Sequence, residues 1–190
     1  MIRTRNVIGC LIAVSLLSGC MAYSEVPPAK KYEIGGVFRV EPATLWSAQK
    51  NGNSENWTVN GFGLDGITFI TNVADGKPVA PTTQDDKAPT FRADMNASDV
   101  VDLYEAVLAS RGFSQVETRN LRPYTISGND AFRFDYSGFD GIGLAKRGTV
   151  IGLIDAEKGL NLVIYEGASE HYYDASLADA EKVLASLEKI

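Results

Sequence analysis

The stretch from residue 113 to residue 166 constrains the fold most, because it reads as a run of β-strands. Within it, Phe132, Phe134 and Tyr136 alternate with Arg133 and Asp135. Successive side chains of a strand point to opposite faces, so this alternation predicts a sheet with one buried face. The strands predicted here cover residues 113–118, 131–136, 149–154 and 160–166.

Two amphipathic helices are expected on either side of these strands. The first covers 97–111, with Asn96 as N-cap, Asp99 near the positive end of the helix dipole, and Gly112 as C-cap candidate. The second covers 176–188, where Ser176 and Asp179 resemble a capping box. Its apolar stripe consists of Leu177, Ala180, Val183, Leu184 and Leu187.

The N-terminal half adds shorter β-rich runs. They lie at 37–40, 57–59 and 67–70, and a long loop rich in proline and aspartate is expected over 75–90. The order of strands, helix, strands and helix, with short connections, favours antiparallel pairing. The sequence therefore predicts an α+β fold, a mainly antiparallel β-sheet covered by helices, in a single domain from 36 to 190.

Three segments resemble the PsbP-like fold, which is known from extrinsic photosystem subunits. They are Gly36 to Pro42, Gly128 to Phe134, and Tyr165 to Leu187. The resemblance implies the PsbP-like arrangement of sheet and helices. Because a fold does not fix a function, neither a photosystem role nor a metal site is carried over.

The N-terminal segment has the features of a bacterial lipoprotein signal. Arg3 and Arg5 precede the apolar run from Val7 to Leu17, and Leu17-Ser18-Gly19-Cys20 resembles the lipobox, where cleavage precedes the cysteine. We expect a signal peptide over 1–19 and acyl chains on Cys20, which would hold the protein to the lipid bilayer. The resemblance to Gram-negative lipoproteins implies that an Asp after the cysteine would favour inner-membrane retention, and Met21 stands at that position. The expected location is therefore the outer membrane, facing the periplasm.

Two other interpretations, a transmembrane helix and an ordinary secretory signal, fit this segment less well. A transmembrane helix needs about 20 apolar residues, and Val7 to Cys20 is shorter than that. An ordinary secretory signal would leave Cys20 as a lone thiol in an oxidising compartment. Residues 20–35, with Pro27-Pro28 and Lys30-Lys31, are expected to form a lipid-anchored tether.

The mature chain would be acidic and without a free cysteine. Removing 1–19 takes two of the 18 basic residues and none of the 24 acidic ones, so the formal charge changes from −6 to −8. This charge argues against a nucleic acid partner. With Cys20 acylated, the mature domain has no thiol nucleophile, and a single histidine makes a zinc or copper site improbable. No metal and no cofactor are expected.

Several short motifs match without their required context. Gly61 to Gly66 fits G-x-G-x-x-G, but the β-branched run Ile67 to Thr71 follows it instead of a helix, so we interpret it as a hairpin connection. Ser47 to Lys50 and Ser186 to Lys189 fit S-x-x-K, yet no K-T-G strand exists. The scattered aspartates match no calcium loop.

Aromatic and basic residues supply the remaining candidates for a site. Tyr165, His171, Tyr172 and Tyr173 cluster before the last helix and form the predicted binding surface, with Trp46 and Trp57 as further aromatic surface. Core packing of the tyrosines is the competing interpretation. The basic candidates are Arg119, Arg122, Arg133 and Arg147, where Arg133 should lie on the face opposite the buried aromatics and bind a carboxylate or pair with Asp135.

Three functions fit these features. The favoured hypothesis is a non-enzymatic envelope module that binds or stabilises an envelope protein, because no nucleophile motif, metal cluster or phosphate loop is present. The alternatives are a small hydrolase that uses His171 with nearby carboxylates, and a periplasmic sensor that binds a small ligand on the aromatic and arginine surface.

Overall fold

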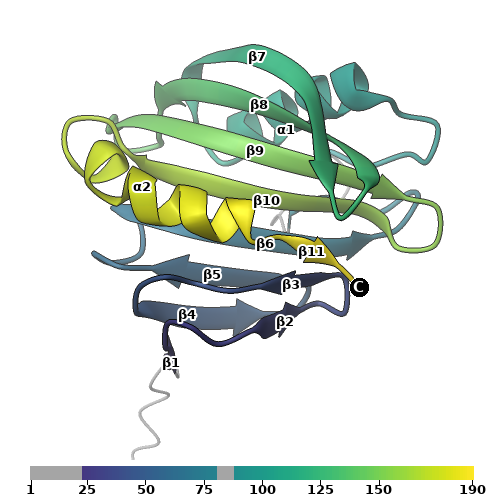
Figure 1. Cartoon of the computed structure of the whole chain (residues 1–190). Helices are drawn as coiled ribbons and strands as arrows, with labels where there is room; N and C mark the ends of the chain where they lie inside the picture. Colours follow the sequence, from purple (N-terminus) through teal and green to yellow (C-terminus); the bar gives the residue numbers. More distant parts are fainter. Residues whose placement is uncertain (1–22, 81–87) are drawn as a thin grey trace, which may run out of the picture.

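The computed structural model of the chain describes residues 23–80 and 88–190. In this part of the chain, eight strands form one antiparallel sheet in the spatial order β1-β4-β5-β6-β10-β9-β8-β7 (Figure 1). The strands are β1 (Ser24–Val26), β4 (Trp46–Asn51), β5 (Ser54–Thr58), β6 (Asp65–Val73), β7 (Ser114–Ile126), β8 (Asn129–Phe139), β9 (Ala145–Asp155) and β10 (Gly159–Ala168).

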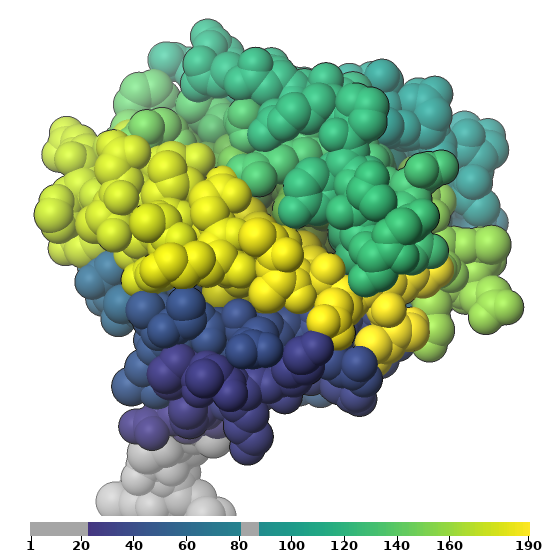
Figure 2. Space-filling model, viewed as in Figure 1, coloured from purple at the N-terminus to yellow at the C-terminus, as the bar shows by residue number. Residues whose placement is uncertain are grey.

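A second, smaller sheet has the order β11-β3-β2. Its strands are β2 (Tyr32–Ile34), β3 (Phe38–Val40) and β11 (Glu188–Lys189). Gly35 and Gly36, both with positive φ, form the tight turn between β2 and β3. In Figure 2 the C-terminal segment lies between the N-terminal strands and the β7–β8 region. The C-terminus is therefore held to the N-terminal part of the domain by β11.

The two helices cover opposite faces of the large sheet. In Figure 1, α2 (Tyr172–Ala185) crosses the front of the sheet and α1 (Ala97–Ser110) lies behind it. Asn96 and Asp99 form a full capping box at the start of α1, and Gly112, with φ 85°, follows its C-cap residue Arg111. The predicted α+β class, a mainly antiparallel sheet covered by helices, is confirmed.

Each face of the sheet has its own hydrophobic core. On the α2 face, Trp46, Trp57 and Tyr165 pack with Val183 and Leu184. On the α1 face, the core contains Phe132, Phe134 and Tyr136 together with α1. The central strands β9 and β10 are buried on both faces, which explains their nearly continuous apolar runs.

The structured domain begins earlier than the predicted boundary at residue 36. β1 pairs with β4, and β2 pairs with β3, so parts of the expected tether over 20–35 are strands. These strands are only three residues long, too short for an alternation to show in the sequence. They gain their order from pairing with distant partners. β4 and β11 were not predicted either.

The last helix also begins earlier than predicted, at Tyr172 instead of Ser176. Ser176 does not cap it. This residue is buried inside the helix and donates its hydroxyl hydrogen bond to the carboxylate of Asp65, at the start of β6. Asp65 also accepts hydrogen bonds from Thr58 and Asn60, so the segment with the G-x-G-x-x-G match is a β5–β6 connection fastened to α2. That segment leads into a strand, as the sequence predicted.

Candidate functional site

A groove lies on the α1 face of the large sheet, between the helix and strands β5, β6 and β10. Its deeper part is a cavity of about 240 Å³. The lining residues are Asn53, Ser54, Asn56, Thr68, Ile70, Val79, Ala80, Tyr104, Val107, Arg111, Ile164 and Glu166. A second hollow of about 210 Å³ shares Asn56, Thr68, Arg111 and Glu166 with it and extends to Lys146 and Phe62. We call the two together the α1 groove.

The sequence periodicities place these side chains on a common surface. Tyr104, Val107 and Arg111 are three and four residues apart and so line one side of α1. Because side chains alternate along β10, Glu166 lies on the α1 face, in the groove, and Tyr165 lies on the α2 face, in the core there. The polar side chain of Thr68 donates a 2.8 Å hydrogen bond to Asn56 on β5, which keeps the floor of the groove polar.

Glu166 is the central charged residue of the α1 groove. Its carboxylate accepts a hydrogen bond from the buried hydroxyl of Tyr136, and Arg111 lies 3.6 Å from the other carboxylate oxygen. Tyr136 stands opposite Gly148 on β9, where an added Cβ would come within 2.2 Å of the tyrosine ring. Gly148 therefore gives this ring room to lie across the sheet and reach Glu166.

Lys146 adds a second positive charge to the α1 groove. The residue is only 4% exposed, and its Nζ donates a hydrogen bond to the backbone oxygen of Gly63. No carboxylate lies within ion-pair distance of Lys146 in the described parts of the chain. Asp65 also lines this hollow, but hydrogen bonds from Thr58, Asn60 and Ser176 occupy its carboxylate. Of the remaining charged residues of the groove, two are cations and one is Glu166, an arrangement that attracts an anion.

Tyr104 supplies an unsatisfied polar group. It is 1% exposed, and its hydroxyl makes no hydrogen bond of full geometry with another described residue, although the side chains of Tyr136 and Arg111 lie close enough to interact with it. Its ring packs edge-on against Phe134 and Tyr136. Burial raises the pKa of Tyr104, and the negative charge of Glu166 raises it further, so the hydroxyl stays protonated. A buried donor without an acceptor is the kind of group that a ligand satisfies.

The predicted aromatic surface is only partly at the surface. Tyr165 is fully buried, and its hydroxyl donates a 2.6 Å hydrogen bond to the backbone oxygen of Tyr173, so Tyr165 is a core residue. Tyr173 is half-buried, with the guanidinium of Arg147 over its ring at 4.3 Å. His171 is exposed and contacts the half-buried Tyr172 edge-on at 5.1 Å. Of the four predicted residues, His171 is exposed, Tyr172 and Tyr173 are half-buried, and Tyr165 is fully buried.

The two tryptophans are likewise core residues instead of aromatic surface. Trp46 and Trp57 are both fully buried on the α2 face, with ring centroids 6.5 Å apart. Trp46 lies on β4, which was not predicted from the sequence, and its position on that strand turns it toward the core. Because no strand was predicted over 46–51, no alternation indicated which way the side chain of Trp46 points.

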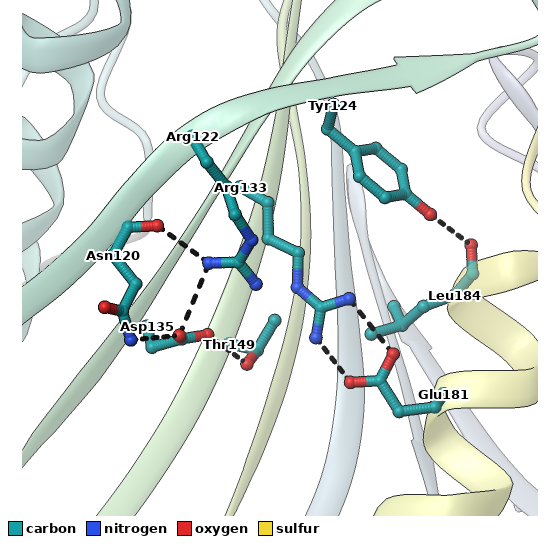
Figure 3. Close-up of polar contacts among 8 residues, drawn as sticks. All are labelled: Asn120, Arg122, Tyr124, Arg133, Asp135, Thr149, Glu181 and Leu184. Atoms are coloured by element: carbon teal, nitrogen blue, oxygen red, sulfur yellow. Dashed lines mark hydrogen bonds and ion pairs between the residues drawn. The ribbon is translucent and has the colours of Figure 1, made fainter.

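The arginine candidates form ion pairs and hydrogen bonds that hold α2 and β7 to the sheet (Figure 3). Arg133 lies on the α2 face, as alternation predicted, and binds the carboxylate of Glu181 through both terminal nitrogens. Arg122 lies 3.4 Å from Asp135, which also accepts a 2.7 Å hydrogen bond from Thr149. Although burial raises the pKa of Asp135, these hydrogen bonds outweigh it and lower that pKa overall.

The remaining arginines are engaged in the same way. Arg147 pairs with Asp174 at the start of α2, and Arg119 donates a 3.0 Å hydrogen bond to Ser137. The basic residues that the sequence singled out are therefore structural contacts. They do not gather into a carboxylate-binding surface.

Metal and membrane features were sought in the same described residues. Across 23–80 and 88–190, no cluster of three histidine, cysteine or acidic side chains is placed to hold a metal ion. In these ranges neither helix has the length and apolar character needed to cross a bilayer. The predicted signal peptide over 1–19 and the acylated Cys20 lie outside the described residues.

Sequence reasoning missed the residues that line the α1 groove. Glu166 ends an apolar strand and Lys146 begins another, which are positions where charged residues usually reach solvent. Tyr104 and Arg111 read as an ordinary helix face and helix end. The one available signal was a charged residue at the end of a strand buried on both faces. That signal can be recognised only once the order of the strands shows which strands are buried on both faces.

Comparison with known proteins gives distant structural similarity only. The sequence matches no protein-family model and has no significant match among characterised proteins. The structure is similar to cyanobacterial PsbP (CyanoP) from Synechocystis sp. PCC 6803, with a TM-score of 0.45 and 14% identity over 96% of this chain and 99% of that one. It is also similar to LpqN, involved in cell envelope biogenesis of Mycobacterium tuberculosis, with a TM-score of 0.37 and 13% identity over 88% of this chain and 91% of that one. At these scores neither similarity brings a site residue or an activity to this protein.

Proposed function

We propose that the protein is a lipid-anchored envelope domain that acts by binding, and that its ligand is a small anion with an apolar portion, held in the α1 groove. The observation that carries the proposal is the pair of cations in this groove, Arg111 and Lys146, beside Glu166 and the buried hydroxyl of Tyr104. The carboxylate of Asp65, which lines the same hollow, is already occupied by hydrogen bonds from Thr58, Asn60 and Ser176.

The groove chemistry suits such a ligand in two ways. A carboxylate or phosphate would accept charge-assisted hydrogen bonds from Arg111 and Lys146, each stronger than a bond between neutral groups. The neutral hydroxyl of Tyr104 would donate a further hydrogen bond. The walls formed by Val107 and Ile164 would cover the apolar portion, at about 0.8 kcal/mol per buried CH₂.

The anchor is the second part of the proposal. The lipobox-like sequence Leu17 to Cys20 supports cleavage before Cys20 and acylation of that residue, and Met21 favours the outer membrane. The domain would then face the periplasm and meet ligands present there or in the bilayer itself.

Calorimetric titration tests the ligand class. The probes are octyl phosphate and octanoate, with octyltrimethylammonium as a cationic probe of the same chain length. We expect the two anions to bind and the cation not to bind. Lys146→Met and Arg111→Gln should each weaken binding about tenfold, about 1.4 kcal/mol. Arg119→Gln, an arginine on β7 away from the groove, is the matched control. Equal binding of all three probes, or no binding, would contradict the ligand class.

A protein partner in the envelope is a second proposal. The exposed His171 and its contact with Tyr172 support it, since aromatic residues at a surface favour recognition. Affinity purification of the lipidated protein from solubilised envelopes tests it. Tyr172→Ala should reduce recovery of a partner that uses this surface. If Lys146→Met reduces recovery of the partner and Tyr172→Ala leaves it unchanged, the partner binds at the groove instead.

The hydrolase alternative lacks a supporting contact. In the described residues, the side chain of His171 makes no hydrogen bond to a serine or to a carboxylate, which is the contact that a catalytic triad requires. An activity assay of His171→Ala tests this hypothesis, because the substitution would abolish any turnover that depends on His171 and leave the fold intact.

A further inference from the structure

Four exposed apolar residues gather at one corner of the large sheet. Of the large hydrophobic residues that are exposed in the described chain, Tyr23, Leu45, Val59 and Phe62 belong to the β1–β4–β5 edge and its connections. The rings of Tyr23 and Phe62 stack at 5.4 Å with an interplanar angle of 20°. We call these four residues the apolar corner.

Strand register places Leu45 and Val59 at the same end of neighbouring strands. Val26 pairs with Trp46, and Ser47 pairs with Thr58, so Leu45 and Val59 lie just beyond the same end of their strands. Phe62 lies in the β5–β6 connection that leaves this end, and it contacts Tyr23 beside the edge strand β1. The stacked rings of Tyr23 and Phe62 thus join the edge strand to the β5–β6 connection, and Leu45 and Val59 are exposed at the strand ends from which that connection leaves.

The corner lies next to the predicted lipid attachment. Only Met21 and Ala22 separate Cys20 from Tyr23. Three extended residues span at most about 11 Å, so Tyr23 would lie no farther than that from the lipidated residue. An acyl chain on Cys20 would thus hold Tyr23 at the bilayer surface. Figure 1 shows the described chain beginning at β1, on the edge of the sheet.

We propose that the apolar corner rests on the lipid bilayer and orients the domain there, with Tyr23 and Phe62 among the headgroups. This inference rests on the anchor in the proposed function. Aromatic residues favour the membrane interface because they combine an apolar body with a polar or polarisable edge. With a mature charge of −8, attraction to anionic lipid does not supply this contact, so burial of apolar surface must.

The orientation has a consequence for the α1 groove. Phe62 also lines the hollow that contains Lys146, Arg111 and Glu166. The groove would then open beside the bilayer surface, where amphiphilic anions are concentrated.

Quenching of tryptophan fluorescence by brominated phosphatidylcholine tests the inference. The acylated mature protein, with Phe62→Trp, is reconstituted in vesicles of this lipid and compared with the wild type, which supplies the background of Trp46 and Trp57. The matched control is Leu121→Trp, because Leu121 is 43% exposed and Phe62 is 40% exposed. Leu121 lies on β7, at the sheet edge opposite β1. It is four strand spacings from β6, the strand that follows Phe62, which is about 19 Å at 4.7 Å per strand.

We expect the added fluorescence at position 62 to be quenched at least twofold more than that at position 121. Equal quenching in an acylated protein, verified by intact mass, would overturn the orientation while leaving the anchor in place. An intact mass without acyl chains would overturn both. If Phe62→Trp fails to fold, Tyr23→Trp makes the same measurement at a residue that is 57% exposed. Quenching that disappears when an envelope protein is co-reconstituted would assign the corner to that protein and overturn the inference.

Discussion

The unpartnered hydroxyl of Tyr104 allows a sharp test of the site. Tyr104 and Tyr136 are each 1% exposed, their rings contact each other, and both lie on the α1 face. They differ in one respect. The hydroxyl of Tyr136 donates to Glu166, whereas that of Tyr104 makes no hydrogen bond of full geometry in the described chain and only lies near Tyr136 and Arg111. Replacing each tyrosine by phenylalanine removes one oxygen and keeps the ring.

The two substitutions should change stability in opposite directions. Burying a hydroxyl without a hydrogen bond costs about 1–3 kcal/mol in proteins, so Tyr104→Phe should stabilise the fold by about 1–2 kcal/mol. A hydrogen bond to a charged group contributes about 1.5–3 kcal/mol, so Tyr136→Phe should destabilise the fold by about 2 kcal/mol. For a domain of this size, each kcal/mol shifts the melting temperature by about 2–4 °C.

Urea unfolding, followed by the fluorescence of the buried Trp46 and Trp57, measures both effects. The same variants enter the titration with octyl phosphate. If Tyr104 donates to the ligand, Tyr104→Phe should be more stable than the wild type and yet bind about tenfold more weakly, a difference of about 1.4 kcal/mol. A gain in stability combined with a loss of binding is the pattern of a group kept for function.

One result would refute this reasoning. If Tyr104→Phe is less stable than the wild type by more than about 1 kcal/mol, the hydroxyl makes a hydrogen bond in the folded protein. The α1 groove would then lose the observation that distinguishes it from an ordinary surface hollow.

Three further predictions follow from the anchor, the core and the charges. Cys20→Ala should release the domain from the membrane or leave the precursor uncut, as intact mass and membrane fractionation would show; an uncut, non-acylated native protein would contradict the anchor. Leu184→Asp should destabilise the domain by about 4 kcal/mol in urea unfolding because it buries an unpaired charge in the α2 core; the half-buried Leu177→Asp should cost much less. The hydrogen bond from Lys189, with those from the backbone of Lys158 and Glu157, lowers the pKa of Asp155 from 3.8 to about 2. Since the folded-state pKa is the lower one, this contribution is present above pH 3.8 and is lost as the pH falls toward 2. Lys189→Met should reduce the dependence of the free energy of unfolding on pH in this range, as urea unfolding at several pH values would show.

Local patterns sufficed for the fold class. The capping residues Asn96 and Asp99 are a local signal of the helix start. The alternation around Phe134 reflects the period of 2 in a strand, and the stripe through Leu184 reflects the period of 3.6 in a helix. Such periods are present in the sequence before any long-range contact forms. The same logic separated the G-x-G-x-x-G match from a dinucleotide site, because β-branched residues follow it.

Long-range pairing decided the rest. The three-residue strands β1 and β2 carry too few residues for a period, and they are ordered only because β4 and β3 offer them partners. Tyr165 could be read as surface or core, and the strand order around β10 determined that it is core. Ser176 looked like a cap, but the approach of Asp65 from another strand turned it into an interior contact.

The sequence by itself therefore indicated the longer strands, both helices, the fold class and the predicted lipid attachment, all of which depend on residues close together in the chain. The tertiary structure alone decided the candidate site. Tyr104, Lys146 and Glu166 come from a helix and two strands, and no local rule places them in one groove. Their charges and the unpartnered hydroxyl acquire chemical meaning only where folding removes them from water together, because burial is what makes an unpaired polar group costly and a fixed charge selective.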